Sequence, residues 1–241
     1  MEKSLLLIFN PQNDLIEGKT SSENNYEDIV KNIILFIENN LDNIHDLVLT
    51  QCSYQRFNIK FPAFWKKDLR IGDIITLGEI MNRTKAPIAG PDEIDYEFLI
   101  EYVAKNGPIT LCKEHCIEGT TGWAFPTKLI KSANNWSINK KRLYSIQKVN
   151  SIPMVDAKSI MTEEYILNQK PFWRVVDYDK IYIAGFFKDT TIAKSIKDLV
   201  STGEYEGKLV FLESCMATLD NKSESLKIIE DAIAHHGASK K

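Results

Sequence analysis

Three side chains in this chain of 241 residues could support acid–base or nucleophilic chemistry. Lys148 could act as a base if burial removed its proton, and Thr191 offers a hydroxyl that such a base could activate as a nucleophile. Asp14 offers a carboxylate that could serve as an acid. Thr191 and Asp14 also have commoner structural roles, because threonine often caps a helix and aspartate often stabilises a turn. The residue types alone leave both interpretations open.

The cysteines are a second set of reactive groups, namely Cys52, Cys112, Cys116 and Cys215. Cys116 directly follows His115, which suggests an activated thiol, although adjacent residues do not face each other usefully. Cys112, His115 and Cys116 also have the spacing of half a zinc site, but the sequence holds no second pair of ligands to complete it. We therefore predict that these cysteines have structural roles.

The elements that must position these groups follow from an alternation of apolar runs with amphipathic stretches of helical period. The predicted strands are 4–9, 46–50, 142–148, 180–186 and 208–212. The predicted helices are 26–41, 95–105, 121–132, 192–200 and 223–234. This order predicts right-handed crossovers and an α/β fold of three layers (α/β/α), in which a central parallel sheet of about five or six strands carries helices on both faces.

We expect residues 1–241 to form a single domain, with a loop or lid at 57–91 that contains one short strand near 73–77. In open parallel sheets, ligands bind outside the carboxyl ends of the strands. The segments in which a site is therefore expected are 10–14, 50–54, 148–156 and 186–191.

At these strand ends the sequence resembles the isochorismatase-like hydrolases, and among them the nicotinamidase-type cysteine hydrolases. The first strand of that family ends in Asp-x-Gln-Asn-Asp, and residues 10–14 read NPQND. A family loop of the form His-Cys-x-x-Gly-Thr-x-Gly corresponds to 115–122, HCIEGTTG. The family lysine at the end of a middle strand corresponds to Lys148, and the nucleophile segment corresponds to 184–192, AGFFKDTTI. The matches occur in the family's order over nearly the whole chain.

The resemblance implies a mechanism in which a cysteine thiolate attacks an amide carbon, an aspartate carries the proton and a lysine holds the pair. The three positions hold Thr191, Asn10 and Lys148 in this sequence, so two of the three residues are substituted. An asparagine amide cannot accept the proton, and a threonine hydroxyl is a much weaker nucleophile than a thiol. The resemblance also implies a cis peptide bond between Phe186 and Phe187 that shapes an oxyanion hole.

Family members of the nicotinamidase type carry a metal ion after the second strand, where it helps to hold a pyridine ring. The positions of its ligands correspond to Cys52, Tyr54 and Lys60, which form a poor divalent site because an ammonium has no lone pair. We therefore expect no metal and no other cofactor. The residues expected to contact a ligand by resemblance are Asp14, Phe61, Phe186 and Phe187.

These observations favour a divergent isochorismatase-like protein that lacks the usual cysteine amidase activity and is retained for small-molecule or protein binding. The alternative is an active, non-standard hydrolase of a C–N or ester bond that uses Lys148 with Thr191 or a cysteine. A third hypothesis is a subunit of a larger assembly that uses only the scaffold.

Composition limits the partners. The chain has 30 Lys and Arg against 33 Asp and Glu, a net charge of −3 and a pI near 5.9, so we expect no nucleic-acid partner. No apolar run has the length of a membrane span, so we expect no membrane association. Scattered cysteines and the lack of a signal-peptide pattern predict a cytoplasmic protein, and the resemblance implies a homo-oligomer.

Overall fold

The structure is a computed structural model that describes residues 2–17, 25–66, 68–88, 96–149, 178–219 and 223–241. Contacts divide the chain into two compact units. The first contains the described residues of 1–52, 119–149 and 157–241, and the second contains those of 53–118.

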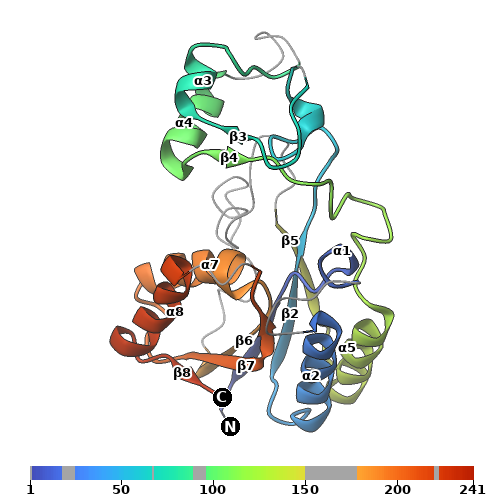
Figure 1. Ribbon diagram of the computed structural model, residues 1–241. Coiled ribbons are helices and arrows are strands. Elements are labelled where there is room, and N and C mark those ends of the chain that lie inside the picture. Colours follow the sequence, from blue (N-terminus) through green and yellow to red (C-terminus); the bar gives the residue numbers. More distant parts are fainter. Residues whose placement is uncertain (1, 18–24, 67, 89–95, 150–177, 220–222) are drawn as a thin grey trace. The chain divides into compact units, whose positions relative to one another are not determined.

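A parallel sheet of six strands forms the centre of the first unit, in the order β5-β2-β1-β6-β7-β8 (Figure 1). The strands are β1 (Ser4–Phe9), β2 (Asp46–Cys52), β5 (Ser145–Val149), β6 (Lys180–Phe186), β7 (Leu209–Ala217) and β8 (Ser239–Lys240). All neighbouring strands run parallel. β1 and β2 are buried along their whole length, as expected for strands covered on both faces.

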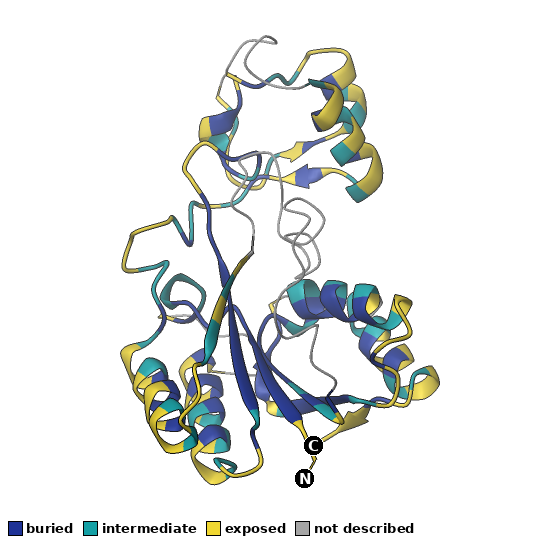
Figure 2. Cartoon of the chain, turned by 180° about the vertical axis from the view of Figure 1, so that it is seen from behind, coloured by how far each residue is buried: buried dark blue, intermediate teal, exposed yellow. Residues whose placement is uncertain are grey.

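Helices cover both faces of this sheet, which confirms the predicted three-layer α/β fold. They are α1 (Asn13–Ile16), α2 (Tyr26–Asn39), α5 (Thr127–Lys140), α7 (Ala193–Ser201) and α8 (Ser223–His235). One core joins Leu6 and Ile8 to apolar residues of α2 and α5, and the other joins Leu5 and Leu7 to apolar residues of α7 and α8. Successive side chains of β1 thus alternate between the two helical layers. Figure 2 shows the result, since the central strands are buried throughout and the helices mainly on one side.

Two boundaries in the first unit differ most from the sequence-based prediction. The helix predicted at 121–132 begins at Thr127. The carbonyl oxygens of residues 122 and 124 accept hydrogen bonds from N–H groups of the turn after β1, and Pro126 occupies the N-cap position. Strand β7 runs on to Ala217 through an irregularity, since Ile183 pairs with Phe211 but Gly185 pairs with Met216. Periodicity cannot reveal such a bulge, because the extra residues shift the alternation.

The second unit has its own small apolar core. Its elements are a 3₁₀ turn (Pro62–Phe64), β3 (Ile74–Ile75), α3 (Leu77–Met81), α4 (Tyr96–Asn106) and β4 (Ile109–Thr110), with β3 and β4 antiparallel. Phe64, Trp65, Ile80 and Leu99 are among the buried residues. The short strand predicted near 73–77 is confirmed, but the remainder of the predicted loop at 57–91 also contains the 3₁₀ turn and α3. A five-residue helix is too short to produce a readable apolar period.

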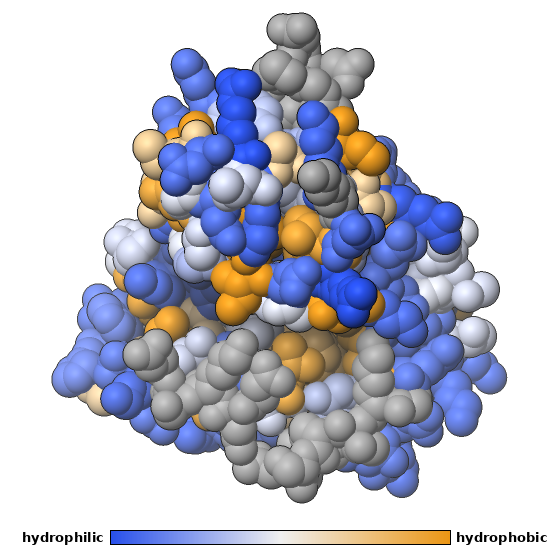
Figure 3. All heavy atoms as spheres, turned by 45° about the horizontal axis from the view of Figure 1, so that its top comes forward, coloured by the Kyte–Doolittle hydropathy of each residue, from blue (hydrophilic) through white to orange (hydrophobic). Residues whose placement is uncertain are grey.

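No helix in the described ranges is long and apolar enough to cross a membrane. Several large apolar side chains are exposed, and Figure 3 shows apolar patches among hydrophilic side chains on one face. The most exposed are Ile71, Met81, Ile138 and Leu143.

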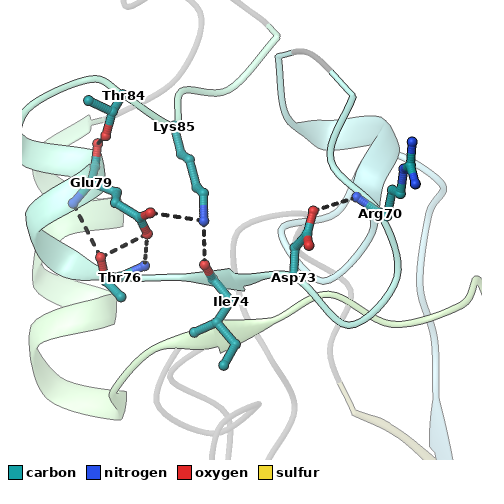
Figure 4. Close-up of polar contacts among 7 residues, drawn as sticks. All are labelled: Arg70, Asp73, Ile74, Thr76, Glu79, Thr84 and Lys85. Atoms are coloured by element: carbon teal, nitrogen blue, oxygen red, sulfur yellow. Dashed lines mark hydrogen bonds and ion pairs between the residues drawn. The ribbon is translucent and has the colours of Figure 1, made fainter.

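Helix α3 starts with a capping box, drawn in Figure 4. The Thr76 hydroxyl accepts a hydrogen bond from the Glu79 N–H, and the Glu79 carboxylate accepts one from the Thr76 N–H at 2.9 Å. Lys85 forms an ion pair with the same carboxylate at 2.9 Å. The hydrogen bond from the Thr76 backbone, together with Lys85, lowers the pKa of Glu79 to about 2.

A pH-dependent stability of the second unit is expected from this carboxylate. Because the pKa of Glu79 is lower in the folded chain than its ordinary value of 4.5, its contribution is present above 4.5 and is lost as the pH falls toward about 2. The protection factors of the α3 amides, which are exchange rates corrected for their intrinsic pH dependence, should therefore fall over this range less in Glu79→Gln than in the wild-type chain. Glu97→Gln, at an exposed position of α4, serves as the control, and equal acid responses of all three proteins would contradict the prediction.

Candidate functional site

Asn10 lies directly after β1 in a left-handed backbone conformation, with φ of 46°. Asparagine tolerates this conformation better than most residues. Its backbone N–H donates to the Thr50 hydroxyl oxygen at 3.1 Å, and the Thr50 hydroxyl donates to the Asn10 side-chain oxygen at 2.7 Å. Asn10 is only 1% exposed, and the Thr50 hydroxyl is the hydrogen-bond partner of its side-chain oxygen. A buried amide donor therefore stands at the carboxyl end of β1.

Gln12 is a residue of this region that the sequence-based reasoning did not single out. Its side-chain nitrogen donates to the carbonyl oxygens of Cys52 and Trp123, both at 2.8 Å. Its side-chain oxygen accepts from the Cys52 N–H, also at 2.8 Å. The fully buried amide therefore joins the turn after β1, the end of β2 and the loop before α5. The sequence signal that could have identified Gln12 is its match to the glutamine in the family pattern Asp-x-Gln-Asn-Asp, which residues 10–14 resemble.

Replacing Gln12 by leucine should destabilise the first unit by about 3 kcal/mol, because it leaves one buried N–H and two carbonyl groups without this partner. Urea unfolding measures the difference. Asn13→Ala is the control, since the Asn13 side chain makes an exposed hydrogen bond to Thr121 and should cost less than about 1 kcal/mol. Similar losses in the two variants would contradict the prediction.

Asp14 lies in the short helix α1 and packs against Gly122. Its N–H donates to the Gly122 carbonyl at 2.9 Å, and a Cβ at Gly122 would come within 2.1 Å of the Asp14 carboxyl carbon. The partly buried carboxylate thus occupies the space beside this glycine. This packing favours the turn-forming role over the catalytic one.

The bond between Phe186 and Phe187 is cis, as the resemblance implies. Both rings are buried and contact Tyr26 of α2, with centroid distances of 5.7 Å for Phe186 and 5.4 Å for Phe187. The two phenylalanines expected to contact a ligand therefore have side chains that pack in the core on the α2 side of the sheet.

Thr191 lies in a π-helical turn, Lys188–Ile192, that connects β6 to α7. It is half-buried, and the N-cap position of α7 is held by Ile192, so Thr191 does not have the capping role that is common for threonine. The buried Asp189 carboxylate caps neither helical segment and instead accepts a hydrogen bond from the Leu219 N–H at 2.9 Å. Lys188 pairs with Glu213 at 2.7 Å and anchors the turn. Single π turns often mark functional positions.

Lys148 lies on β5 in register with Gln51 of β2. It is exposed, and its ammonium stands 5.2 Å from the centroid of the Trp123 ring, a cation–π contact. The burial on which a basic Lys148 depends is therefore not observed. Residues 150–156 of the strand-end segment 148–156 lie outside the described residues.

The sheet register places Lys148 and Thr50 on different faces of the sheet. Ile146 pairs with Leu49, which belongs to the core with α2 and α5, so Lys148, two residues on, lies on that face. Thr50, the partner of Asn10, lies on the opposite face, because it follows Val48 of the other core by two residues. Asn10 and Thr191 follow adjacent strands, β1 and β6.

The second unit brings together Tyr54, Lys60, Phe61 and His115. The Tyr54 ring contacts Phe61 at a centroid distance of 5.6 Å and His115 at 5.1 Å. The Lys60 ammonium lies 3.4 Å from the Tyr54 hydroxyl. Phe61, expected to contact a ligand, is fully buried against Tyr54 and His115. Sequence reasoning treated His115 as loop structure and did not place it in this cluster.

These residues do not fit a divalent metal ion. Tyr54 supplies a phenol and Lys60 an ammonium, and the positive charge would repel a cation. In the part of the chain that the structure describes, no group of three or more His, Cys, Asp or Glu side chains could hold a metal. Cys112 lies 3.9 Å from the His115 ring nitrogen, and buried Cys116 accepts the Tyr54 N–H through its backbone carbonyl. Both contacts agree with structural roles for these cysteines.

The six-stranded parallel sheet and its two helical layers match the isochorismatase-like α/β fold. No protein-family model and no curated protein matches the sequence. Solved nicotinamidase structures, in contrast, match over the whole chain. The Acinetobacter baumanii nicotinamidase/pyrazinamidase is 18% identical, with a TM-score of 0.61 and coverage of 100% of this chain and 96% of the other.

Two further solved structures are also similar over nearly the whole chain. The yeast nicotinamidase is 14% identical with a TM-score of 0.65, and 98% of each chain is covered. The pyrazinamidase of Pyrococcus horikoshii, solved in complex with zinc, is 14% identical with a TM-score of 0.57 and covers 99% of this chain and 98% of its own. At these identities the likeness shows the fold alone.

Proposed function

We propose that this chain is a nicotinamidase-fold protein that has lost cysteine-dependent amide hydrolysis and binds a small molecule at the carboxyl edge of its sheet. The observation that carries this proposal is Asn10, at the position of the family aspartate, with its side-chain oxygen engaged by the Thr50 hydroxyl. An amide in this position cannot take a proton from a nucleophile or return one to a leaving group.

Two further observations support the loss of chemistry. The nucleophile position holds Thr191, whose hydroxyl needs a strong base nearby. The cation that could supply this base, Lys148, is exposed and contacts Trp123. The alternative of an active Thr191 hydrolase therefore lacks a base among the residues that the resemblance selects.

A retained binding role is supported by the side-chain nitrogen of Asn10. The Asn10 amide is a hydrogen-bond donor at the carboxyl end of β1 whose oxygen is already engaged by Thr50, so its nitrogen could donate to an oxygen atom of a ligand. A carboxamide or carboxylate oxygen is such an acceptor. Solved neighbours are named for nicotinamide and pyrazinamide hydrolysis, and one is a complex with nicotinate, so pyridine carboxamides and carboxylates are the first ligands to test.

The test combines turnover with binding. The purified chain, incubated with nicotinamide or pyrazinamide, should release no ammonia above the protein-free blank. Saturation-transfer NMR should detect contact with nicotinamide or nicotinate, and Asn10→Leu should weaken this signal because it removes the donor. Turnover that disappears in Lys148→Met would overturn the loss of chemistry, and no signal from any pyridine ligand would overturn the binding role for this class.

A further inference from the structure

The cluster around Lys60 has a geometry that the proposed function does not use. The ammonium stands 3.4 Å from the Tyr54 hydroxyl and 5.4 Å from the centroid of the Tyr54 ring. Tyr54 is buried and Lys60 is half-buried, so the positive charge is partly withdrawn from solvent. A phenol oxygen and an aromatic face both stabilise an ammonium in such surroundings.

The backbone holds Lys60 in this position from two sides. Its N–H donates to the Asn58 side-chain oxygen at 3.1 Å. Its carbonyl accepts the Cys112 N–H at 2.9 Å and the Cys112 thiol at 3.6 Å. Tyr54 is tied to the same neighbouring segment, because its N–H donates to Cys116 and its carbonyl accepts from Glu118. Two chain segments, 54–60 and 112–118, therefore fix the ammonium against the phenol.

His115 keeps one potential metal ligand in this cluster. A carbonyl can only accept, so the contact of 2.9 Å between its Nδ1 and the Lys113 carbonyl assigns the proton to Nδ1. In the neutral ring the lone pair is then on Nε2. A single imidazole beside an ammonium and a phenol does not make a divalent site, since zinc in proteins takes several nitrogen, sulfur or carboxylate ligands.

We propose that the Lys60 ammonium is a built-in cation that replaces a divalent metal ion in this fold, so that the chain does not bind zinc. The positive charge of the lysine repels a divalent cation, and its protonated nitrogen has no lone pair with which to coordinate the metal. The inference concerns the second unit and does not depend on whether the first unit retains catalysis or binds a ligand.

The experiment measures zinc content after incubation with excess zinc and gel filtration. The wild-type chain should retain less than about 0.1 zinc per molecule, and EDTA should leave its thermal unfolding midpoint unchanged. The double variant Tyr54→His, Lys60→His would supply three imidazoles with His115 and should retain about one zinc. Lys66→His, at an exposed position of the same segment, is the control and should behave as wild type.

Two results would overturn the inference. One is about one zinc in the wild-type chain that is lost in His115→Ala, which would show a metal site despite the ammonium. The other is no gain of zinc in the double variant when circular dichroism shows it to be folded, since Lys60 would then not be what excludes the ion. If the double variant does not fold, the single variant Lys60→His tests the inference instead, because it removes the half-buried ammonium and leaves the buried Tyr54 intact. A competition assay with a chromophoric chelator should then detect zinc binding in this variant and none in Lys66→His.

Discussion

Gly185→Ala is expected to prevent folding of the first unit. Gly185 lies on β6 beside β1 with φ of 114°, and a Cβ there would lie 2.2 Å from the Phe9 carbonyl oxygen and 2.5 Å from the Phe9 nitrogen. Both atoms belong to the backbone of a fully buried strand, so neither can move without breaking the β1–β6 pairing. The expected loss exceeds about 4 kcal/mol, the range of the most damaging single substitutions.

Substitution of a second glycine, Gly203, distinguishes the effect of this clash from the effect of backbone strain alone. Gly203 also has a positive φ, 71°, but no heavy atom lies within 4 Å of its Cβ position. Gly203→Ala should therefore cost only about 1 kcal/mol, the price of the left-handed conformation. Soluble yield and thermal unfolding by circular dichroism compare the two variants. Equal effects would contradict the close approach of β1 and β6 at Phe9.

The sheet was readable from the sequence because its strands are covered on both faces. Uninterrupted apolar runs marked β1 and β6 at their observed bounds, Ser4–Phe9 and Lys180–Phe186. β8 (Ser239–Lys240) carries no such signal, because it is two exposed polar residues that pair only through the backbone. Helix α3 was missed for a related reason, since the Thr76 capping box and not an apolar period starts it.

The candidate site was less readable, because residue spacing does not specify side-chain direction. Motif order identified Asn10, Lys148 and Thr191, but not the left-handed backbone of Asn10 or the π turn around Thr191. The face on which Lys148 lies depends on its register with Gln51, and a shift by one residue would reverse it. Gln12 was overlooked because its three hydrogen bonds go to backbone groups that are distant in sequence.

Asn10→Asp is expected to make stability fall steeply as the pH rises. The substitution changes shape little, but it introduces a carboxyl at a position that is 1% exposed and has the Thr50 hydroxyl as a donor. Because Lys148 is exposed and its ammonium contacts the Trp123 ring, burial should dominate and raise the pKa of the new carboxyl above that of the unfolded chain. The folded state then binds more protons than the unfolded state, so stability declines above about pH 4, by about 1.4 kcal/mol per pH unit, until the folded-state pKa is reached.

Urea unfolding of the variant and the wild-type chain at several values between about pH 4 and pH 7 measures this slope, with an expected difference of up to about 4 kcal/mol. Lys148→Met in both backgrounds is the control and should leave the slope unchanged. An ammonium within reach of position 10 would have the opposite effect, because it would lower the pKa of the carboxyl and make the variant gain stability as the pH rises. A positive slope that Lys148→Met abolishes would show that the two side chains meet at one site after all.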